Sequence, residues 1–203
     1  RNCLVFVTNG YMSKEATESM AGLIDAVVVD FKGNGDDKFA NIYEAVPSNA
    51  PIKETLLNFK KLGIHIELTD LVVPQVGDSL QACDELTKWI ASSLGADTPL
   101  QFTRFYPSYK MQNFPETPIK TLEEHYKIAK SNGLNYVYIG NVLGTRYENT
   151  YCPVCGAIAI KRNGFAVEEI NIDEQGRCRK CGTKLFIKGT AKLSPGDEIF
   201  SIY

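Results

Sequence analysis

Strand-like and helix-like segments alternate along residues 1–150, and this order limits the chain to few folds. Apolar, β-branched runs are separated by segments with the apolar period of a helix. The expected strands are Cys3–Val7, Ala26–Phe31, Ile64–Val73, Leu100–Tyr106 and Tyr136–Gly140. The expected helices are Ser13–Leu23, Pro51–Leu62, Asp78–Leu94 and Thr121–Asn132. Repeated strand–helix–strand order predicts an α/β fold with parallel strands and right-handed crossovers.

Polar residues follow several of the expected strands. In parallel α/β folds, both open sheets and barrels, ligands bind at the carboxyl ends of the strands. These positions hold Thr8, Asn9, Asp30, Lys32 and Tyr106. Alternation places Asp30 and Lys32 on one face, where a carboxylate and an ammonium group could bind the two ends of an amino acid. The alternatives are a simple turn at Thr8 and Asn9, and an ordinary surface ion pair at Asp30 and Lys32.

The sequence also predicts where the last expected helix, Thr121–Asn132, begins. Thr121 and Glu124 have the spacing of a capping box, which predicts that the helix begins at Thr121. His125 then falls just behind the cap, where we expect it to be exposed.

Four of the six cysteines form two matching Cys-x-x-Cys-Gly pairs. No secretory signal pattern opens the chain, so this spacing indicates metal ligands rather than disulfides. Four thiolates favour Zn²⁺, and Fe in the manner of rubredoxin fits the same ligands. Such a site has no open position and is expected to fold a small ribbon. The predicted ligands are Cys152, Cys155, Cys178 and Cys181.

Composition and charge exclude several classes of protein. Hydrophobic residues make up 44% of the chain and charged residues 23%, which is typical of a globular protein. The net charge of −2 and pI of about 5.8 provide no basic field for nucleic acid or an anionic membrane. No apolar run is long enough to span a bilayer. We therefore expect a cytoplasmic protein without a nucleic-acid or membrane partner.

The charge balance also predicts two domains. Residues 151–203 carry 8 Lys/Arg and 6 Asp/Glu, whereas residues 1–150 carry 14 and 18. We expect an α/β domain over residues 1–148 and a four-cysteine module over residues 149–203.

Six segments taken together resemble the radical S-adenosylmethionine (SAM) enzymes of the pyruvate formate-lyase activating branch. They are most similar to the radical SAM protein of the AmmeMemoRadiSam system. The segments read VTNGYMSKEA, IDAVVVDFKG, HIELTDLVVP, QFTRFYPSYKM, TLEEHYKIAKSNGLNYVYIGNV and YENTYCPVCGAIAIKRNGF. They run over nearly the whole chain, including the first cysteine pair.

The resemblance implies the C-terminal part of a partial (β/α)6 TIM-type barrel, followed by a rubredoxin-like zinc ribbon. In the family, a Cys-x-x-x-Cys-x-x-Cys motif after the first strand holds a 4Fe–4S cluster. That motif is absent from this chain, which opens on Arg1 rather than Met. We expect the chain to begin at the third barrel strand, within a domain.

The resemblance also implies an activity. The family's cluster binds SAM and cleaves it reductively to methionine and a 5′-deoxyadenosyl radical, which abstracts hydrogen from a substrate. That substrate could be a protein glycine, a peptide or a small molecule. Because the cluster ligands are absent, the fragment alone is expected to be inactive.

Few site residues carry over from the family. Thr8 and Asn9 match the ribose side, Asp30 and Lys32 match the pair near the methionyl carboxylate, and Tyr106 stands where relatives usually have His. Two positions depart from the pattern. Val7 stands where the activating enzymes have a cation-binding Asp, and Thr69 replaces an Arg. The acids that could compensate on that strand are Glu67 and Asp70.

Two other functions remain open. The ribbon could be the working part, as a binding or electron-transfer module on a non-catalytic α/β scaffold. The α/β portion could also be a barrel relic that only holds partners. Iron in the four-thiolate site would favour electron transfer, and zinc a structural or docking role.

Overall fold

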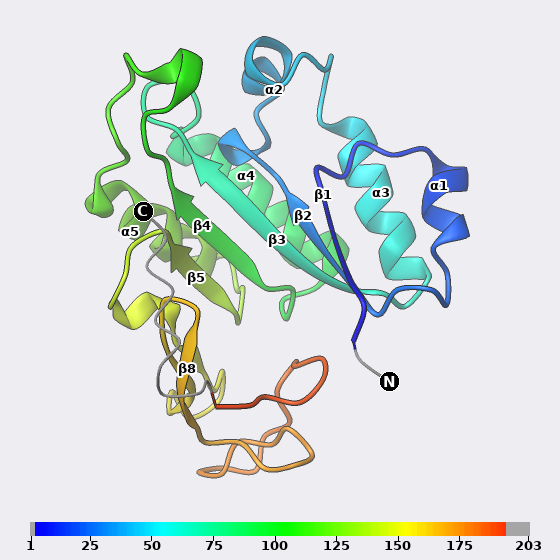
Figure 1. The fold of residues 1–203 in the computed structure, drawn as a ribbon, viewed down its shortest axis with the longest axis vertical. Coiled ribbons are helices and arrows are strands. Elements are labelled where there is room, and N and C mark those ends of the chain that lie inside the picture. Colours follow the sequence, from blue (N-terminus) through cyan, green and yellow to red (C-terminus); the bar gives the residue numbers. More distant parts are fainter. Residues whose placement is uncertain (1–2, 194–203) are drawn as a thin grey trace. The chain divides into compact units, whose positions relative to one another are not determined.

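Five strands form the main sheet of the computed structural model, which describes residues 3–193. They lie side by side in the order of the sequence, and the paired strands run parallel (Figure 1). The strands are β1 (Val5–Thr8), β2 (Ala26–Asp30), β3 (His65–Val72), β4 (Leu100–Arg104) and β5 (Val137–Gly140). The expected α/β fold with a parallel sheet is confirmed.

Helices connect successive strands. They are α1 (Lys14–Ser19), α2 (Asp37–Tyr43), α3 (Ala50–Lys61), α4 (Leu80–Trp89) and α5 (Ile119–Ser131). Short 3-10 or π turns are η1 (Gly33–Gly35), η2 (Ile90–Leu94), η3 (Tyr109–Met111) and η4 (Arg146–Glu148). Over residues 3–193, no helix is both long and apolar enough to cross a membrane.

Helix α5 begins earlier than the capping-box spacing predicts. Pro118 is its N-cap, and the carbonyl of Pro118 accepts from the N–H groups of Thr121 and Leu122. Proline fixes φ near the helical value and so favours a helix start directly after it. Thr121 therefore lies inside the first turn, and the capping box predicted from Thr121 and Glu124 is wrong.

Within residues 3–139, the sheet has one face covered by helices and one face without a helix, called the open face below. Along β3, buried Ile66, Leu68 and Val72 alternate with more exposed residues. Helices α4 and α5 lie behind the sheet in Figure 1. Because successive side chains of a strand point to opposite faces, Asp30 of β2 and Thr69 of β3, which are register partners, lie on the open face.

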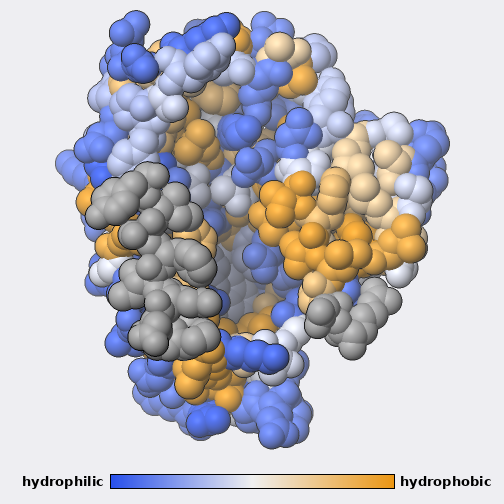
Figure 2. Space-filling model, in the orientation of Figure 1, coloured by the Kyte–Doolittle hydropathy of each residue, from blue (hydrophilic) through white to orange (hydrophobic). Residues whose placement is uncertain are grey.

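Strand β1 is the edge of this sheet. Only its pairing with β2 occurs within the described residues. Figure 2 shows a patch of hydrophobic residues over β1 and the neighbouring helices. The exposed apolar side chains here, 48% to 68% accessible, are Leu4, Val5, Val7 and Leu23. An unpaired edge strand with valines exposed on one face is a surface that other protein normally covers.

A small apolar cluster lies at the carboxyl edge of the sheet. Buried Phe39, Val73 and Phe105 form its centre. They come from α2 and from the segments that follow β3 and β4, and they pack with Leu71, Val76, Met111 and Phe114. The cluster joins α2 to the loops that follow β3 and β4.

The chain divides into two compact units, residues 1–139 and 140–203. In the second unit, β6 (Thr150–Tyr151), β7 (Ile158–Asn163) and β8 (Ala166–Ile170) form an antiparallel sheet. Its buried side chains are few, and they include Cys152, Ala159, Ile160, Ile172, Cys178 and Leu185. Such a small core provides little folding free energy on its own.

Candidate functional site

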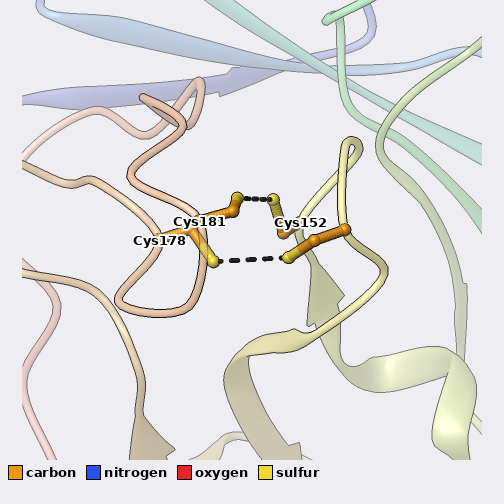
Figure 3. Close-up of side chains that lie close together, drawn as sticks. Cys152, Cys178 and Cys181 are labelled. Atoms are coloured by element: carbon orange, nitrogen blue, oxygen red, sulfur yellow. Dashed lines mark hydrogen bonds between the residues drawn. The ribbon is translucent and has the colours of Figure 1, made fainter.

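The four predicted cysteine ligands lie together in the second unit. All four sulfur atoms lie within 4.8 Å of one another. Cys152 Sγ is 3.5 Å from Cys181 Sγ, and Cys155 Sγ is 3.7 Å from Cys178 Sγ (Figure 3). A tetrahedron of metal–sulfur bonds of about 2.3 Å has edges of about 3.8 Å. The two short sulfur–sulfur distances match such an edge, so the four cysteines could hold a metal ion such as Zn²⁺ or Fe.

Both cysteine pairs adopt the same turn. In each, the first cysteine donates its N–H to the carbonyl five residues later and accepts from the N–H of the glycine. These bonds of 2.8–2.9 Å join Cys152 to Ala157 and Gly156, and Cys178 to Thr183 and Gly182. Gly156 and Gly182, which follow the second cysteine of each pair, have φ of 68° and 74°, a conformation that favours glycine.

Hydrogen bonds to sulfur make the thiols unequal. The hydroxyl and the N–H of Thr183 lower the pKa of Cys181 to about 6. The backbone bond at Ala157 lowers the pKa of Cys155, but desolvation and the three neighbouring thiols outweigh it and raise this pKa to about 11. Because a metal binds the thiolate form, loading this site releases protons and depends on pH.

At the carboxyl edge of the sheet, Asp30 and Lys32 lie together as predicted. Lys32 Nζ is 3.9 Å from Asp30 Oδ2 and 3.7 Å from Glu44 Oε1. The Glu44 side chain is only 17% exposed. Burial raises the pKa of Glu44, while the charge of Lys32 opposes the shift. The result is a cluster of two carboxylates and one ammonium group, the charge pattern that an α-amino acid would complement.

Sequence reasoning missed Glu44. The residue is the C-cap of α2, a helix that was not expected, and Ala45 follows it in the left-handed conformation (φ 56°). A carboxylate at a helix C-terminus opposes the helix dipole, and a non-glycine residue at positive φ is uncommon. The signal available in the sequence was Asp36, which caps α2 by accepting from the N–H groups of Lys38 and Phe39.

Thr8 and Asn9 make local bonds in the loop after β1. Thr8 Oγ1 accepts from the N–H of Gly10, and Asn9 Oδ1 accepts from the N–H of Tyr11. This is the turn that the sequence allowed as the alternative to a ribose contact. The backbone bonds occupy one acceptor site on each side chain, so a further hydrogen bond to a ligand stays feasible.

Tyr106 follows β4 and is 48% exposed. Its hydroxyl accepts from Arg104 Nη1 at 3.3 Å, and the guanidinium lies 5.1 Å from the ring centroid. Arg104 is itself held by the carbonyl of Thr117 and by Glu116. Tyr106 is thus oriented by a fixed arginine at the edge of the sheet.

Asn34 lies in the loop that follows Asp30 and Lys32, with a left-handed backbone (φ 59°). Its N–H donates to Asp70 Oδ1 at 3.0 Å, and both residues are buried. Asp70 Oδ2 has no hydrogen-bond partner over residues 3–193. Desolvation raises the pKa of Asp70 to about 8, against the bond from Asn34 and helped by the charges of Glu44 and Asp30. Asp70 therefore holds its proton at neutral pH.

The side chain of Asn34 connects this loop to α5. Its Nδ2 lies within 3.3 Å of the carbonyls of Gly77 and Ser79 and 3.1 Å from His125 Nε2. His125 Nδ1 is 2.8 Å from the carbonyl of Thr121, so Nδ1 carries the proton and Nε2 accepts. Burial lowers the pKa of His125 and favours this neutral form. The prediction of an exposed His125 is wrong: the residue is fully buried.

The two acids proposed to compensate for Thr69 do not lie together. Glu67 shares the open face of β3 with Thr69, whereas Asp70 points to the helix-covered face. The other two cysteines also lie apart from any cluster site. Cys3 is exposed, and Cys83 is buried in α4. Residues 3–193 therefore offer no ligand set for an iron–sulfur cluster beside the sheet.

Comparison with known proteins identifies a related sequence and solved structures of similar fold. No family model matches the chain. "Uncharacterized protein MJ0808" of Methanocaldococcus jannaschii is 44% identical over 186 residues, which is 90% of this chain and 54% of that protein. The chain thus spans about half the length of the curated relative that it matches.

Two solved structures share the fold over about two thirds of the chain. A domain of pyruvate-formate lyase-activating enzyme from Bacteroides vulgatus superposes with a TM-score of 0.57 at 12% identity, covering 66% of this chain and 79% of that one. A radical SAM methyltransferase from Sphaerobacter thermophilus superposes with a TM-score of 0.51 at 14% identity, covering 68% and 40%. Over about two thirds of its length, the chain therefore has the fold of these two proteins.

Proposed function

We propose that the chain is the C-terminal portion of a radical SAM enzyme of the activating-enzyme type, carrying a four-cysteine metal ribbon. The observation that carries the proposal is the charged cluster of Asp30, Lys32 and Glu44 on a sequentially ordered parallel sheet. Sequential order with helices on one face is the arrangement of a barrel segment, in which the open face becomes the interior. AmmeMemoRadiSam proteins are the branch that we favour.

The edge of β1 supports a barrel that continues beyond this chain. Further strands paired with β1 would satisfy its free backbone groups and cover Val5 and Val7. The relative, which is about 1.7 times as long as this chain, is consistent with such a protein. We propose that the added part completes a partial (β/α)6 barrel and supplies the ligands of a 4Fe–4S cluster.

The residues at the carboxyl edge would bind and orient SAM. Lys32 would pair with the methionyl carboxylate, and Asp30 would hold Lys32 in place. Thr8, Asn9 and Tyr106 would line the ribose side, with Tyr106 positioned by Arg104. When bound together, SAM and the cluster supply the one-electron chemistry of hydrogen abstraction. The substrate would be a protein glycine, a peptide or a small molecule.

The decisive experiment uses the longer protein that the proposal implies, in which a part that supplies the cluster ligands precedes this chain. We expect that protein to be brown, to hold a 4Fe–4S cluster and to form 5′-deoxyadenosine from SAM and a reductant. The 203-residue chain alone should form none. A colourless longer protein that leaves SAM intact would refute the proposal.

Lys32→Met in the longer protein tests the SAM site itself. Loss of a charge-assisted bond of about 1.5–3 kcal/mol should raise the KM for SAM about 10- to 100-fold. Lys127→Met is the matched control, because Lys127 is exposed on α5. Equal KM values for the two variants would contradict a role of Lys32 in SAM binding.

The geometry of the four sulfurs also favours a second function, which is electron transfer. The same tetrahedron accepts iron, so the ribbon could carry electrons. Elemental analysis of protein purified without oxygen separates the two roles. Iron that is reversibly reduced would support electron transfer, and zinc would support a structural ribbon.

A further inference from the structure

The two cysteine turns are near repeats that differ at one functional position. Each turn places a backbone N–H beside the sulfur of its second cysteine, from Ala157 in the first turn and from Thr183 in the second. Thr183 adds a hydroxyl, and its Oγ1 lies 3.2 Å from Cys181 Sγ. Alanine at the equivalent position has no polar side-chain atom. The second turn therefore has one more hydrogen-bonding group directed at a sulfur.

The extra group lies at the most accessible corner of the site. Cys152 and Cys178 are buried and Cys155 is partly buried, whereas Cys181 is exposed. Solvent, chelators and oxidants reach an exposed ligand first. In a four-thiolate site, Cys181 is thus the ligand from which exchange or oxidation would begin.

We propose that Thr183 is a positioning residue for the metal ligand Cys181, an inference that rests on the proposed metal site. A metal-bound thiolate has no proton, so the Thr183 hydroxyl must be the donor of this bond. The bond fixes the orientation of the sulfur and withdraws charge from it. Both effects should slow dissociation of Cys181 and reduce its reactivity toward electrophiles.

The experiment compares variants of the zinc-loaded full chain. Thr183→Val keeps the shape of the side chain and removes the hydroxyl, and Thr183→Ser retains the hydroxyl. Thr190→Val is the matched control, since Thr190 is an exposed threonine of the same segment. Zinc transfer to a chromogenic chelator gives the release rate, and alkylation mapped by mass spectrometry gives the reactivity of each cysteine.

We expect Thr183→Val to release zinc about 10- to 100-fold faster, the usual effect of losing a hydrogen-bond partner of a ligand. Alkylation should rise at Cys181 and stay unchanged at Cys155. Thr183→Ser and Thr190→Val should both behave as the wild type. With iron in the site, Thr183→Val should also lower the reduction potential, because hydrogen bonds to sulfur favour the reduced state.

Three results would overturn the proposal. One is zinc release from Thr183→Val at the wild-type rate, and another is the same acceleration in Thr190→Val. A third is a Thr183→Ser variant as labile as Thr183→Val, which would assign the effect to packing. The cobalt-loaded wild type tests the metal site separately. A missing thiolate-to-cobalt absorption band would refute both the metal site and the role of Thr183. If the band is present, the three results above refute only the role of Thr183.

Discussion

Replacing Cys178 by serine is expected to abolish metal binding and to unfold residues 140–193, while the five-stranded sheet stays folded. Cys178 is a buried predicted ligand, and its removal leaves three thiolates for a tetrahedral metal. Structural Zn²⁺ supplies about 10–16 kcal/mol to small metal domains. A unit of about 60 residues has a total stability of only about 3–9 kcal/mol. The folding free energy contributed by the metal therefore exceeds the total stability of the unit, so loss of the metal should unfold it.

Metal content and amide NMR spectra measure the two effects separately. The wild type should bind one metal ion per chain, and its spectrum should show dispersed signals from both units. In Cys178→Ser, only signals from residues 140–193 should collapse, and a strong chelator should produce the same change in the wild type. Cys3→Ser is the control, because Cys3 is exposed and lies in the sheet unit. A metal-free second unit with dispersed signals would contradict the prediction.

Features set by local spacing could be predicted from the sequence. The two Cys-x-x-Cys-Gly motifs identified all four sulfurs that the structure brings together. Alternating apolar segments identified the five strands and their parallel direction. In both cases the signal lies within a few neighbouring residues. Four thiolates around one metal ion and a buried parallel strand each allow few other sequence patterns.

Features that depend on distant residues could not be predicted. Asn34, Asp70 and His125 are 36 to 91 residues apart, and each has a type that is ordinary on a surface. These residues become buried only when three elements pack together, so their burial cannot be inferred from the local sequence. Glu44 was missed for the same reason, since α2 is short and its position beside Lys32 is a tertiary contact.

The buried Asp70 carboxyl should make the sheet unit less stable as pH rises. Its pKa is about 8 in the folded chain against an ordinary value of 3.8. Between these values the folded state holds a proton that the unfolded state has lost, so the stability contributed by Asp70 is greatest below pH 3.8 and declines up to pH 8. The slope is at most about 1.4 kcal/mol per pH unit. From pH 6.5 to 8, above the ordinary pKa of histidine, the free energy of unfolding should fall by about 1.5 kcal/mol.

The groups around Asp70 do not reverse this trend. Asp30 and Glu44 are acidic neighbours that disfavour its ionisation. Burial lowers the pKa of His125, which contacts Asp70 through Asn34, so its own contribution to stability rises with pH only up to about its ordinary value of 6.5. Trp89 is the only tryptophan and lies in α4, so its fluorescence in denaturant titrations reports the sheet unit alone.

Asp70→Asn and Asp70→Ala separate the charge from the hydrogen bond. Asparagine keeps an oxygen to accept from Asn34 and has no proton to lose. Its unfolding free energy should therefore be nearly independent of pH from 6.5 to 8 and should exceed that of the wild type at pH 8. Alanine leaves the buried N–H of Asn34 without its acceptor, which costs about 1–3 kcal/mol at every pH. Asp97→Asn, an exposed control, should keep the wild-type slope. A pH slope that persists in Asp70→Asn would place the titrating group elsewhere, whereas its loss would identify Asp70 as the buried acid that limits stability beside the proposed SAM site.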